Sequence, residues 1–327
     1  SPKPSLATLL SRFRKIPEEK ITEDQKHYLY LLLKLEAIAT NHLINTGYYQ
    51  KALKSLLFQY ELAKTLKDDL SLRIASSGLG IVYTRTGNLE EAHKAYVEAI
   101  SIADKINDRF GFAKVLSDMA TLHRRMGKHQ EALDHFHRSL KIFESLGNLV
   151  FQGIVLHGIG EVHLQDGHDS EALKYFRKAL KIARKSKDLF GISFEQDAIG
   201  DILFNSGKIA EAKTQYLKNL KLQLQINDNE GIAHTYGNLG NVARMEKNLP
   251  LAIDYYTKNI KITGEIGDQD GQGRGFYNLS LVYEDLQDRE KATEYLQKAL
   301  KCFKQAGSVK FIELTKKRLQ EYQPQKE

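Results

Sequence analysis

The sequence contains a single cysteine, Cys302, among 327 residues. One thiol excludes an internal disulfide and a thiolate metal cluster, and Cys302 occupies an apolar position in a predicted helix. The chain also lacks a run of about eighteen apolar residues, so we expect no membrane-spanning helix. Its start, SPKPSLATLLSRFRK, has two prolines and no long apolar core with a cleavage site. We therefore expect no signal peptide and a cytoplasmic location.

Motifs of known catalytic sites are missing as well. The sequence has no nucleophile elbow, phosphate-binding loop, HExxH motif or paired carboxylates that stand apart from the repeat described below. The pairs His135/His137 and His157/His163 lack the i, i+4 spacing of a helical zinc site, and no Cys or carboxylate cluster accompanies them. We expect no enzyme, no metal site and no cofactor.

Charge of one sign does not dominate either. The 48 Lys and Arg residues are interspersed with 41 Asp and Glu residues, which leaves a net charge of +7. The basic stretch 171–188 carries its Lys and Arg opposite a packing stripe that includes Ala172 and Phe176. A solvated surface explains this stretch better than a nucleic-acid site, so we expect no nucleic-acid partner.

What the sequence does contain is a period of forty residues, seen when segment 68–107 is shifted along the chain. At one position of every copy stands a side chain that can cap the start of a helix: Asp68, Asp108, Asn148, Asp188, Asp228, Asp268 and Ser308. Gly or Asn often precedes it, as suits the left-handed residue that ends a helix. A second turn is marked by Gly47, Gly87, Gly127, Gly167 and Gly207, then by Lys247 and Gln287. Each period therefore encodes two helices.

Between these turns the apolar residues follow helical spacing, as in the pair Leu79 and Tyr83. His123 and His163 occupy the position of Tyr83 and are interpreted as core residues. A small residue recurs beside this stripe: Thr40, Gly80, Ala120, Gly160, Gly200, Gly240 and Ser280. The second helix has an invariant alanine: Ala52, Ala92, Ala132, Ala172, Ala212, Ala252 and Ala292. A large residue follows four positions later: Leu56, Tyr96, Phe136, Phe176, Tyr216, Tyr256 and Leu296. These faces are buried only between neighbouring helix pairs, so one helix pair alone is not expected to fold.

The order LG, Y, G, EA, then Y or F resembles the tetratricopeptide repeat over residues from about 30 to 306. The stretch YGNLGNVARMEKNLPLAIDYY at 236–256 carries the closest likeness. The period is forty instead of thirty-four, and the usual proline after the second helix is missing. This long form is similar to the repeats of LGN/Pins, of kinesin light chain and of bacterial signalling proteins. The resemblance implies an all-α, right-handed superhelical solenoid of about seven antiparallel helix pairs with terminal capping helices.

We predict four parts of the chain. Residues 1–21 form a leader or a short capping helix, whose apolar residues are Leu6, Leu9, Leu10 and Phe13. Residues 22–306 form seven helix pairs, opened by a capping box of Thr22 and Gln25. Residues 307–322 form a capping helix. Residues 323–327 are expected to be disordered.

The resemblance further implies that the first helices line a concave groove that holds a peptide segment of a protein partner. Candidate groove residues are the polar positions outside the packing stripe: Arg85, Lys114, Asp118, Arg124, Arg125, His157, Glu161, Asp197, Asp201, Asn238, Asn241, Arg244, Arg274, Tyr277, Asn278, Glu284 and Asp285. The asparagines fit the family's way of holding a peptide backbone, and Arg85, Arg124 and Arg125 suit acidic groups of the partner.

Three other readings stay open at this point. The chain could be the sensory or regulatory module of a larger transcription regulator, kinase or cyclase. It could be a phosphatase-like regulator that holds a response-regulator partner in the groove. Exposed apolar edges at the ends of the array could also join two copies into a homodimer.

Overall fold

The computed structural model describes residues 22–322, and in this range it has fifteen α-helices and no strands. The segments 1–21 and 323–327, for which we predict a leader and a disordered tail, lie outside the described residues. The all-α class predicted from the sequence is confirmed. The chain divides into two compact units, residues 1–168 and residues 169–327, and each is described by itself.

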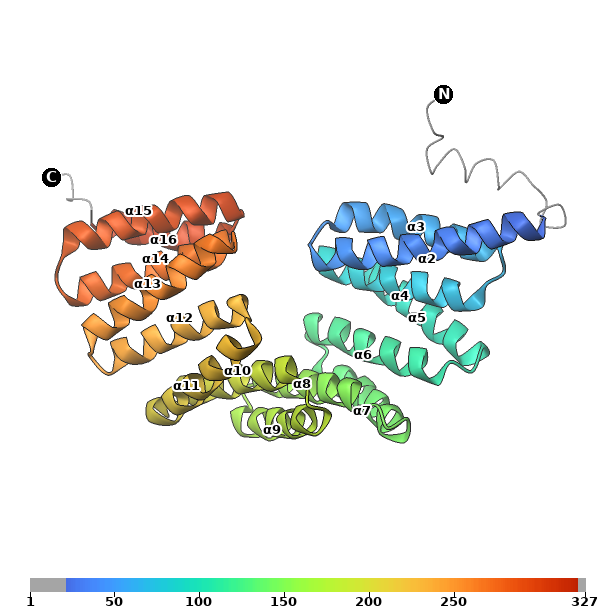
Figure 1. The fold of residues 1–327 in the computed structure, drawn as a ribbon, viewed down its shortest axis with the longest axis horizontal. Coiled ribbons are helices and arrows are strands. Elements are labelled where there is room, and N and C mark those ends of the chain that lie inside the picture. Colours follow the sequence, from blue (N-terminus) through green and yellow to red (C-terminus); the bar gives the residue numbers. More distant parts are fainter. Residues whose placement is uncertain (1–21, 323–327) are drawn as a thin grey trace, which may run out of the picture. The chain divides into compact units, whose positions relative to one another are not determined.

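In the first unit, consecutive helices run antiparallel (Figure 1). They are α2 (Glu23–Asn45), α3 (Tyr49–Thr65), α4 (Asp69–Thr86), α5 (Leu89–Lys105), α6 (Arg109–Arg125), α7 (His129–Ser145) and α8 (Leu149–Gln165). Each helix packs on the next one in sequence, and α4 also contacts α6, which in turn contacts α8. The first helices of successive pairs therefore form a layer of their own.

The second unit repeats this arrangement (Figure 1). Its helices are α9 (Asp169–Ser186), α10 (Leu189–Asn205), α11 (Ile209–Ile226), α12 (Asn229–Met245), α13 (Leu249–Glu265), α14 (Gln269–Asp285), α15 (Arg289–Ala306) and α16 (Val309–Glu321). Here α10, α12 and α14 are the neighbouring first helices, and α16 packs on α15. The helix predicted after Ser308 is thus present at the end of the array.

The helix starts follow the predicted capping pattern. Asp108 accepts a hydrogen bond of 2.8 Å from the amide of Gly111, and the caps at 68, 148, 188, 228 and 268 bind the amide three residues on in the same way. Thr22 and Gln25 form the predicted capping box. Ser308 is different, because its hydroxyl donates to the carboxylate of Asp270 instead of accepting from its own helix.

The turns and the core also follow the repeat. Lys247 and Gln287, which replace the turn glycine, have φ angles of 62° and 61°. The backbone of these two residues therefore adopts the left-handed conformation that glycine adopts in the other turns. All seven invariant alanines have a relative exposure of 0%. The large residue four positions later packs against the small residue of the first helix. A Cβ added at Gly240, for example, would lie 2.5 Å from the ring of Tyr256.

Of the two histidines interpreted as core residues, His123 is buried and His163 is half-buried. The rings of His93, His123 and His135 gather where α5, α6 and α7 meet. The ring centroids of His93 and His123 are 5.8 Å apart, and those of His123 and His135 are 5.0 Å apart. His123 is therefore a buried imidazole at the repeat position of Tyr83, whereas His93 is exposed.

Candidate functional site

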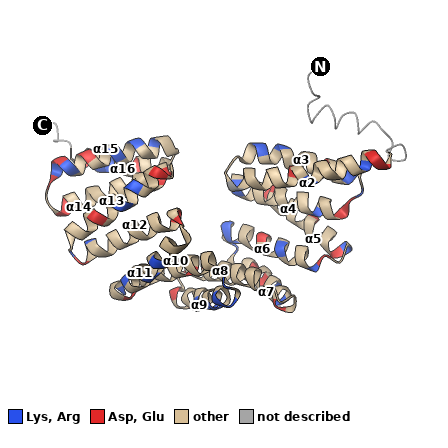
Figure 2. Ribbon diagram, in the orientation of Figure 1, with Lys and Arg blue, Asp and Glu red and all other residues tan. Residues whose placement is uncertain are grey.

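The candidate site of each unit is its first-helix face, which we define by one position of the repeat: Ile74, Lys114 and Ile154 in the first unit, and Phe194, His234 and Arg274 in the second. Ile74, Ile154, Phe194, His234 and Arg274 are exposed, and Lys114 is half-buried. Both polar and apolar side chains occur at this position, because it points away from the packing stripe. Lys and Arg (blue) and Asp and Glu (red) occur in both units (Figure 2).

In the first unit, the predicted site residues include several that are already paired. Arg124 on α6 lies 3.0 Å from Glu161 on α8, and the ring of His157 lies 3.9 Å from the same carboxylate. Lys114 lies 3.5 Å from Asp118, one turn along α6. Burial raises the pKa of Asp118, and the ammonium of Lys114 offsets part of that rise. These groups form internal ion pairs along and between first helices.

Two of the predicted site arginines in the first unit remain accessible. Arg85, in the last turn of α4, is exposed and makes no hydrogen bond or ion pair with residues 22–322. Arg125, at the end of α6, is also exposed and donates only a long bond of 3.3 Å to the carbonyl oxygen of Thr84 on α4. Both guanidinium groups are close enough to Tyr96 to lower its pKa, although burial raises that pKa far more. This end of the face can bind a carboxylate.

In the second unit, Asp201 on α10 accepts hydrogen bonds from Tyr216 at 2.7 Å and from Asn238 at 2.8 Å. Burial raises the pKa of Asp201, and these two hydrogen bonds oppose the rise. Asp197, one turn earlier, accepts from Gln223 at 3.0 Å and from Thr235 at 3.1 Å. Two carboxylates thus anchor α11 and α12 to α10.

Further contacts connect α12, α14 and α16. Arg244 binds Asp285 through two nitrogens, at 2.6 and 3.2 Å. Arg274 lies 2.6 Å from Asp270, and its guanidinium is 4.9 Å from the ring centroid of Phe311. Tyr277 is half-buried, and burial raises its pKa.

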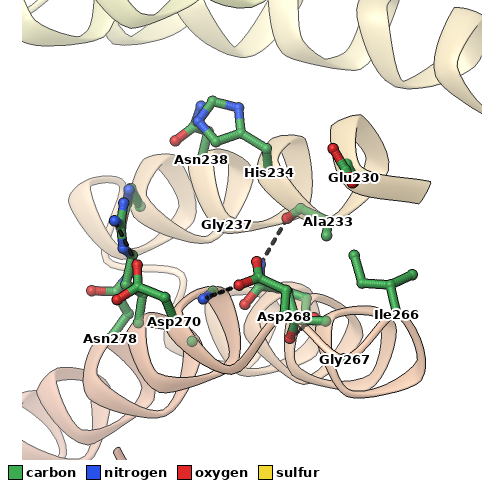
Figure 3. A pocket seen from close by; sticks show the side chains of 16 residues that line it. Glu230, Ala233, His234, Gly237, Asn238, Ile266, Gly267, Asp268, Asp270 and Asn278 are labelled. Atoms are coloured by element: carbon green, nitrogen blue, oxygen red, sulfur yellow. Dashed lines mark hydrogen bonds and ion pairs between the residues drawn. The ribbon is translucent and has the colours of Figure 1, made fainter. Parts of the chain in front are cut away.

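A pocket of about 700 Å³ lies between α12 and α14. It is lined by Glu230, His234, Asn238, Asn241, Asp270, Arg274 and Asn278, among others. Figure 3 shows His234 and Asn238 projecting from the same side of α12, with Asp270 and Asn278 on the neighbouring helix. The carboxylate of Asp197, 3.9 Å from the ring of His234, raises the pKa of that histidine.

The three asparagines differ in what they can still bind. Asn238 has given one of its two N–H donors to Asp201, and the oxygen of Asn241 accepts from Tyr256 at 2.7 Å. Asn278 lines the pocket and makes no hydrogen bond with the described residues, so its donors and its acceptor are both unused. Only Asn278 keeps the full pairing capacity expected of all three.

Sequence reasoning missed one part of this face. A second pocket, of about 780 Å³, lies between α10 and α12 and includes Phe190 and Phe194, whose exposed fractions are 62% and 59%. We had no prediction for these residues, because an apolar residue in a first helix resembles core. The signal was present in the repeat: Phe194 aligns with Lys114, His234 and Arg274, and a core position would not accept those charges.

Clusters of metal ligands and membrane-spanning helices are both absent from residues 22–322. No group of three or more His, Cys, Asp or Glu side chains in this range could hold a metal ion. None of its helices is both long enough and apolar enough to cross a membrane.

Comparison with known families identifies the repeats. The family model described as tetratricopeptide repeat matches residues 111–185 and 232–305. The chain therefore contains tetratricopeptide repeats. A model of anaphase-promoting complex subunit 5 also matches residues 37–125. A search of curated proteins found no match.

Solved structures share the fold of these tetratricopeptide repeats. A signal-transduction ATPase with a tetratricopeptide-repeat sensor from Pyrococcus horikoshii has a TM-score of 0.66 at 20% identity, covering 94% of this chain and 49% of its own length. The quorum sensor NprR from B. thuringiensis has a TM-score of 0.67 at 17% identity, covering 96% and 91%. Aspartyl phosphate phosphatase F from Bacillus subtilis has a TM-score of 0.66 at 14% identity, covering 92% and 76%.

At these identities the likeness shows the fold alone. The chain spans about half the length of the Pyrococcus protein.

Proposed function

We propose that this tetratricopeptide-repeat protein is a non-enzymatic scaffold that binds a peptide segment of a protein partner on its first-helix faces. The observation that supports this most is the pocket between α12 and α14, of about 700 Å³, with the unused amide of Asn278 in its lining. Concave sites with a few polar groups that keep their bonding capacity are typical of ligand sites. An extended segment presents one backbone donor and one acceptor per residue, which is what a free amide side chain complements.

In the first unit, the accessible arginines Arg85 and Arg125 would bind acidic side chains or a terminal carboxylate of the partner. Arginine suits this role because its planar guanidinium donates two parallel hydrogen bonds to a carboxylate. Arg124, which the sequence placed in the same group, is occupied by Glu161 and would contribute to the fold instead. Homodimer formation through the ends of the array remains a separate proposal, to be checked by measuring the mass in solution.

Site-specific photo-crosslinking tests the proposal. A photoreactive phenylalanine replaces His234, an exposed residue beside the pocket that leaves Asn278 intact, in one variant and Lys221, an exposed residue of the second helix α11, in the matched control. We expect one partner segment to crosslink through position 234 and not through position 221, with the crosslinked peptide identified by mass spectrometry. Equal crosslinking at both positions, or crosslinking at 221 alone, would contradict a first-helix binding face.

A second candidate is that the chain is the sensory module of a larger signalling protein. The match to about half of a longer ATPase with a sensor of the same fold favours it. Expression of the full gene from its native start would decide, because a product of the present length rules out an attached output domain.

The structural likeness to an aspartyl phosphate phosphatase suggests a third function, in which the chain acts on a phosphorylated response regulator. Release of phosphate from such a regulator by the wild-type chain, and loss of that release in Asn278→Ala, would support it. The cytoplasmic location belongs to the main proposal and is checked by cell fractionation.

A further inference from the structure

The pocket between α10 and α12 carries an exposed aromatic pair. Phe190 and Phe194 are one helical turn apart on α10, so their rings lie on one side of the helix. Both rings line the pocket and both are more than half exposed. Single exposed apolar residues are ordinary, but two large rings beside a hollow of about 780 Å³ form a surface suited to covering by a ligand side chain.

The same pocket is surrounded by negative charge. Its lining contains the four carboxylates of Asp197, Asp201, Asp228 and Glu230, and no Lys or Arg of the described chain belongs to it. Asp197, Asp201 and Asp228 accept hydrogen bonds from uncharged donors, namely Gln223, Thr235, Tyr216, Asn238 and the amide of Gly231. The lining also contains His234, whose ring lies 3.9 Å from Asp197. Four carboxylates beside one imidazole leave the pocket with a net negative charge. An apolar patch inside a negative field attracts cations that carry apolar groups.

Glu230 is the exposed carboxylate of this pocket. It is exposed in the first turn of α12, lines both pockets, and makes no hydrogen bond or ion pair with residues 22–322. The arginine of the neighbouring pocket does not neutralise it, because Arg274 is bound to Asp270. Glu230 is therefore available to a ligand cation.

We infer that the partner segment bound by the second unit places a large apolar side chain against Phe190 and Phe194 and a Lys or Arg side chain next to Glu230. This inference rests on the proposed peptide-binding function and specifies the chemistry of the peptide. The apolar side chain covers the two rings, the cation lies among the four carboxylates, and the backbone continues toward Asn278. The partner expected from the arginines of the first unit was acidic, so the second unit adds the opposite requirement.

Charge supplies specificity as well as attraction. A segment with Asp or Glu at the same place would be repelled by Glu230 and by the three half-buried carboxylates of the pocket, which outnumber its single histidine. The second unit should therefore discriminate between segments that differ only in the sign of one side chain.

Binding of defined short peptides to the purified chain tests this. The probes carry one Phe and one Lys at varied spacing in a Gly/Ser background, with matched series in which Glu replaces Lys or Ala replaces Phe. Fluorescence anisotropy gives the dissociation constant of each. We expect the best Phe/Lys peptide to bind about tenfold more tightly than its Phe/Glu and Ala/Lys counterparts.

Variants at Glu230 separate a charge effect from damage to the fold. Glu230→Lys should reverse the preference, so that Phe/Glu peptides bind more tightly than Phe/Lys peptides. Glu230→Gln should reduce the preference, whereas Asn229→Lys, which changes the net charge equally in the same helical turn but lies outside both pockets, should leave it unchanged. A reversal cannot result from unfolding.

Failure of the inference and failure of the proposed function give different results. If peptides bind and Asn278→Ala weakens them, but Lys and Glu peptides bind alike, the charge requirement is wrong and the binding face stands. If no Phe/Lys peptide binds at up to about 1 mM, while the crosslinked partner segment depends on Asn278, the inference alone is wrong. If Asn278→Ala and Glu230→Lys change the binding of neither the probe peptides nor the crosslinked segment, the inference and the proposed function are both wrong.

Discussion

Asn238 on α12 donates a hydrogen bond of 2.8 Å to Asp201 on α10, thirty-seven residues earlier in the chain. The same kind of contact recurs between neighbouring first helices: Arg125 to Thr84, Arg124 to Glu161, Thr235 to Asp197 and Arg244 to Asp285. Polar residues of these helices therefore join one helix pair to the next. Those that make no such contact with the described residues, such as Arg85, Glu230 and Asn278, are the best candidates for binding.

Replacing Asp201 should destabilise the protein without any ligand. Asp201→Ala leaves the hydroxyl of Tyr216, whose residue is 1% exposed, and the amide of Asn238 without their acceptor. An unsatisfied buried donor costs about 1–3 kcal/mol, so urea unfolding should show a loss of that size. Asn278→Ala is the control and should change stability by less than about 0.5 kcal/mol. Equal losses of unfolding free energy in the two variants would show that the hydrogen bonds to Asp201 do not stabilise the fold.

Two glycines of α12 should respond oppositely to alanine. A Cβ at Gly240 would lie 2.5 Å from the Tyr256 ring, whereas a Cβ at Gly237 would meet nothing nearer than 3.5 Å, at the amide of Asn259. We expect Gly240→Ala to cost about 1–3 kcal/mol through overpacking. Gly237→Ala should be neutral or stabilise by up to about 1 kcal/mol, because alanine favours the helix. Thermal unfolding of both variants checks this, and a stable Gly240→Ala protein would refute the close-packing account.

The fold could be predicted from the sequence because its signals are local and repeated. A capping side chain such as Asp108 or Asp228 acts on an amide three residues away, and the alanine and aromatic positions of the second helix are four apart. Such short-range patterns do not depend on how helix pairs are placed. Seven copies in one register also let deviations stand out, as with Lys247 in a left-handed turn.

The site could be predicted only in part, because its chemistry depends on partners in the next pair. Whether Asn238 is free or occupied is decided by Asp201 on another helix, and no rule of local spacing connects the two. Arg124 and Glu161 were both expected in the groove, but their mutual contact at 3.0 Å was not. The exposure of Phe190 and Phe194 does not follow from residue type, because phenylalanine in a helix is typical of the core; only the repeat register, which aligns Phe194 with charged residues, indicates it.

The histidine cluster of the first unit should make stability depend on pH. Burial lowers the pKa of His123 and of His135, and the neighbouring His93 lowers both further, with Lys128 near His123 and Arg138 near His135 acting in the same direction. The unfolded chain, with a pKa near 6.5, then takes up protons before the folded chain does. Stability is complete above that value and falls as the pH drops through it.

His123→Phe isolates this effect. Between about pH 7.5 and pH 5 the wild-type chain should lose more unfolding free energy than the variant, with at most about 1.4 kcal/mol per pH unit for each proton. His234, whose pKa is raised by Asp197, contributes with the opposite sign and cancels in the comparison. Parallel pH profiles measured by urea unfolding would exclude His123 as a source of acid sensitivity.

The last helix should depend on one ion pair. Arg318 on α16 donates a bond of 2.8 Å to Glu284 on α14. Burial alone would raise the pKa of Glu284, but the hydrogen bonds from Arg318 and Tyr322 hold it below its ordinary value. Arg318→Ala should accelerate amide hydrogen exchange in α16 and reduce stability by about 1 kcal/mol. Lys317→Ala, the exposed neighbour, is the control, and similar exchange in the two variants would contradict a docking role for Arg318.

Hydrogen exchange of the purified chain with and without its partner segment tests the central claim most directly, once crosslinking has supplied that segment. Ligand contact slows the exchange of amides that it covers or stabilises. We predict slower exchange in α10, α12 and α14, with the second helices α11, α13 and α15 unchanged. Protection confined to the second helices would contradict the claim that the first-helix face is the binding surface.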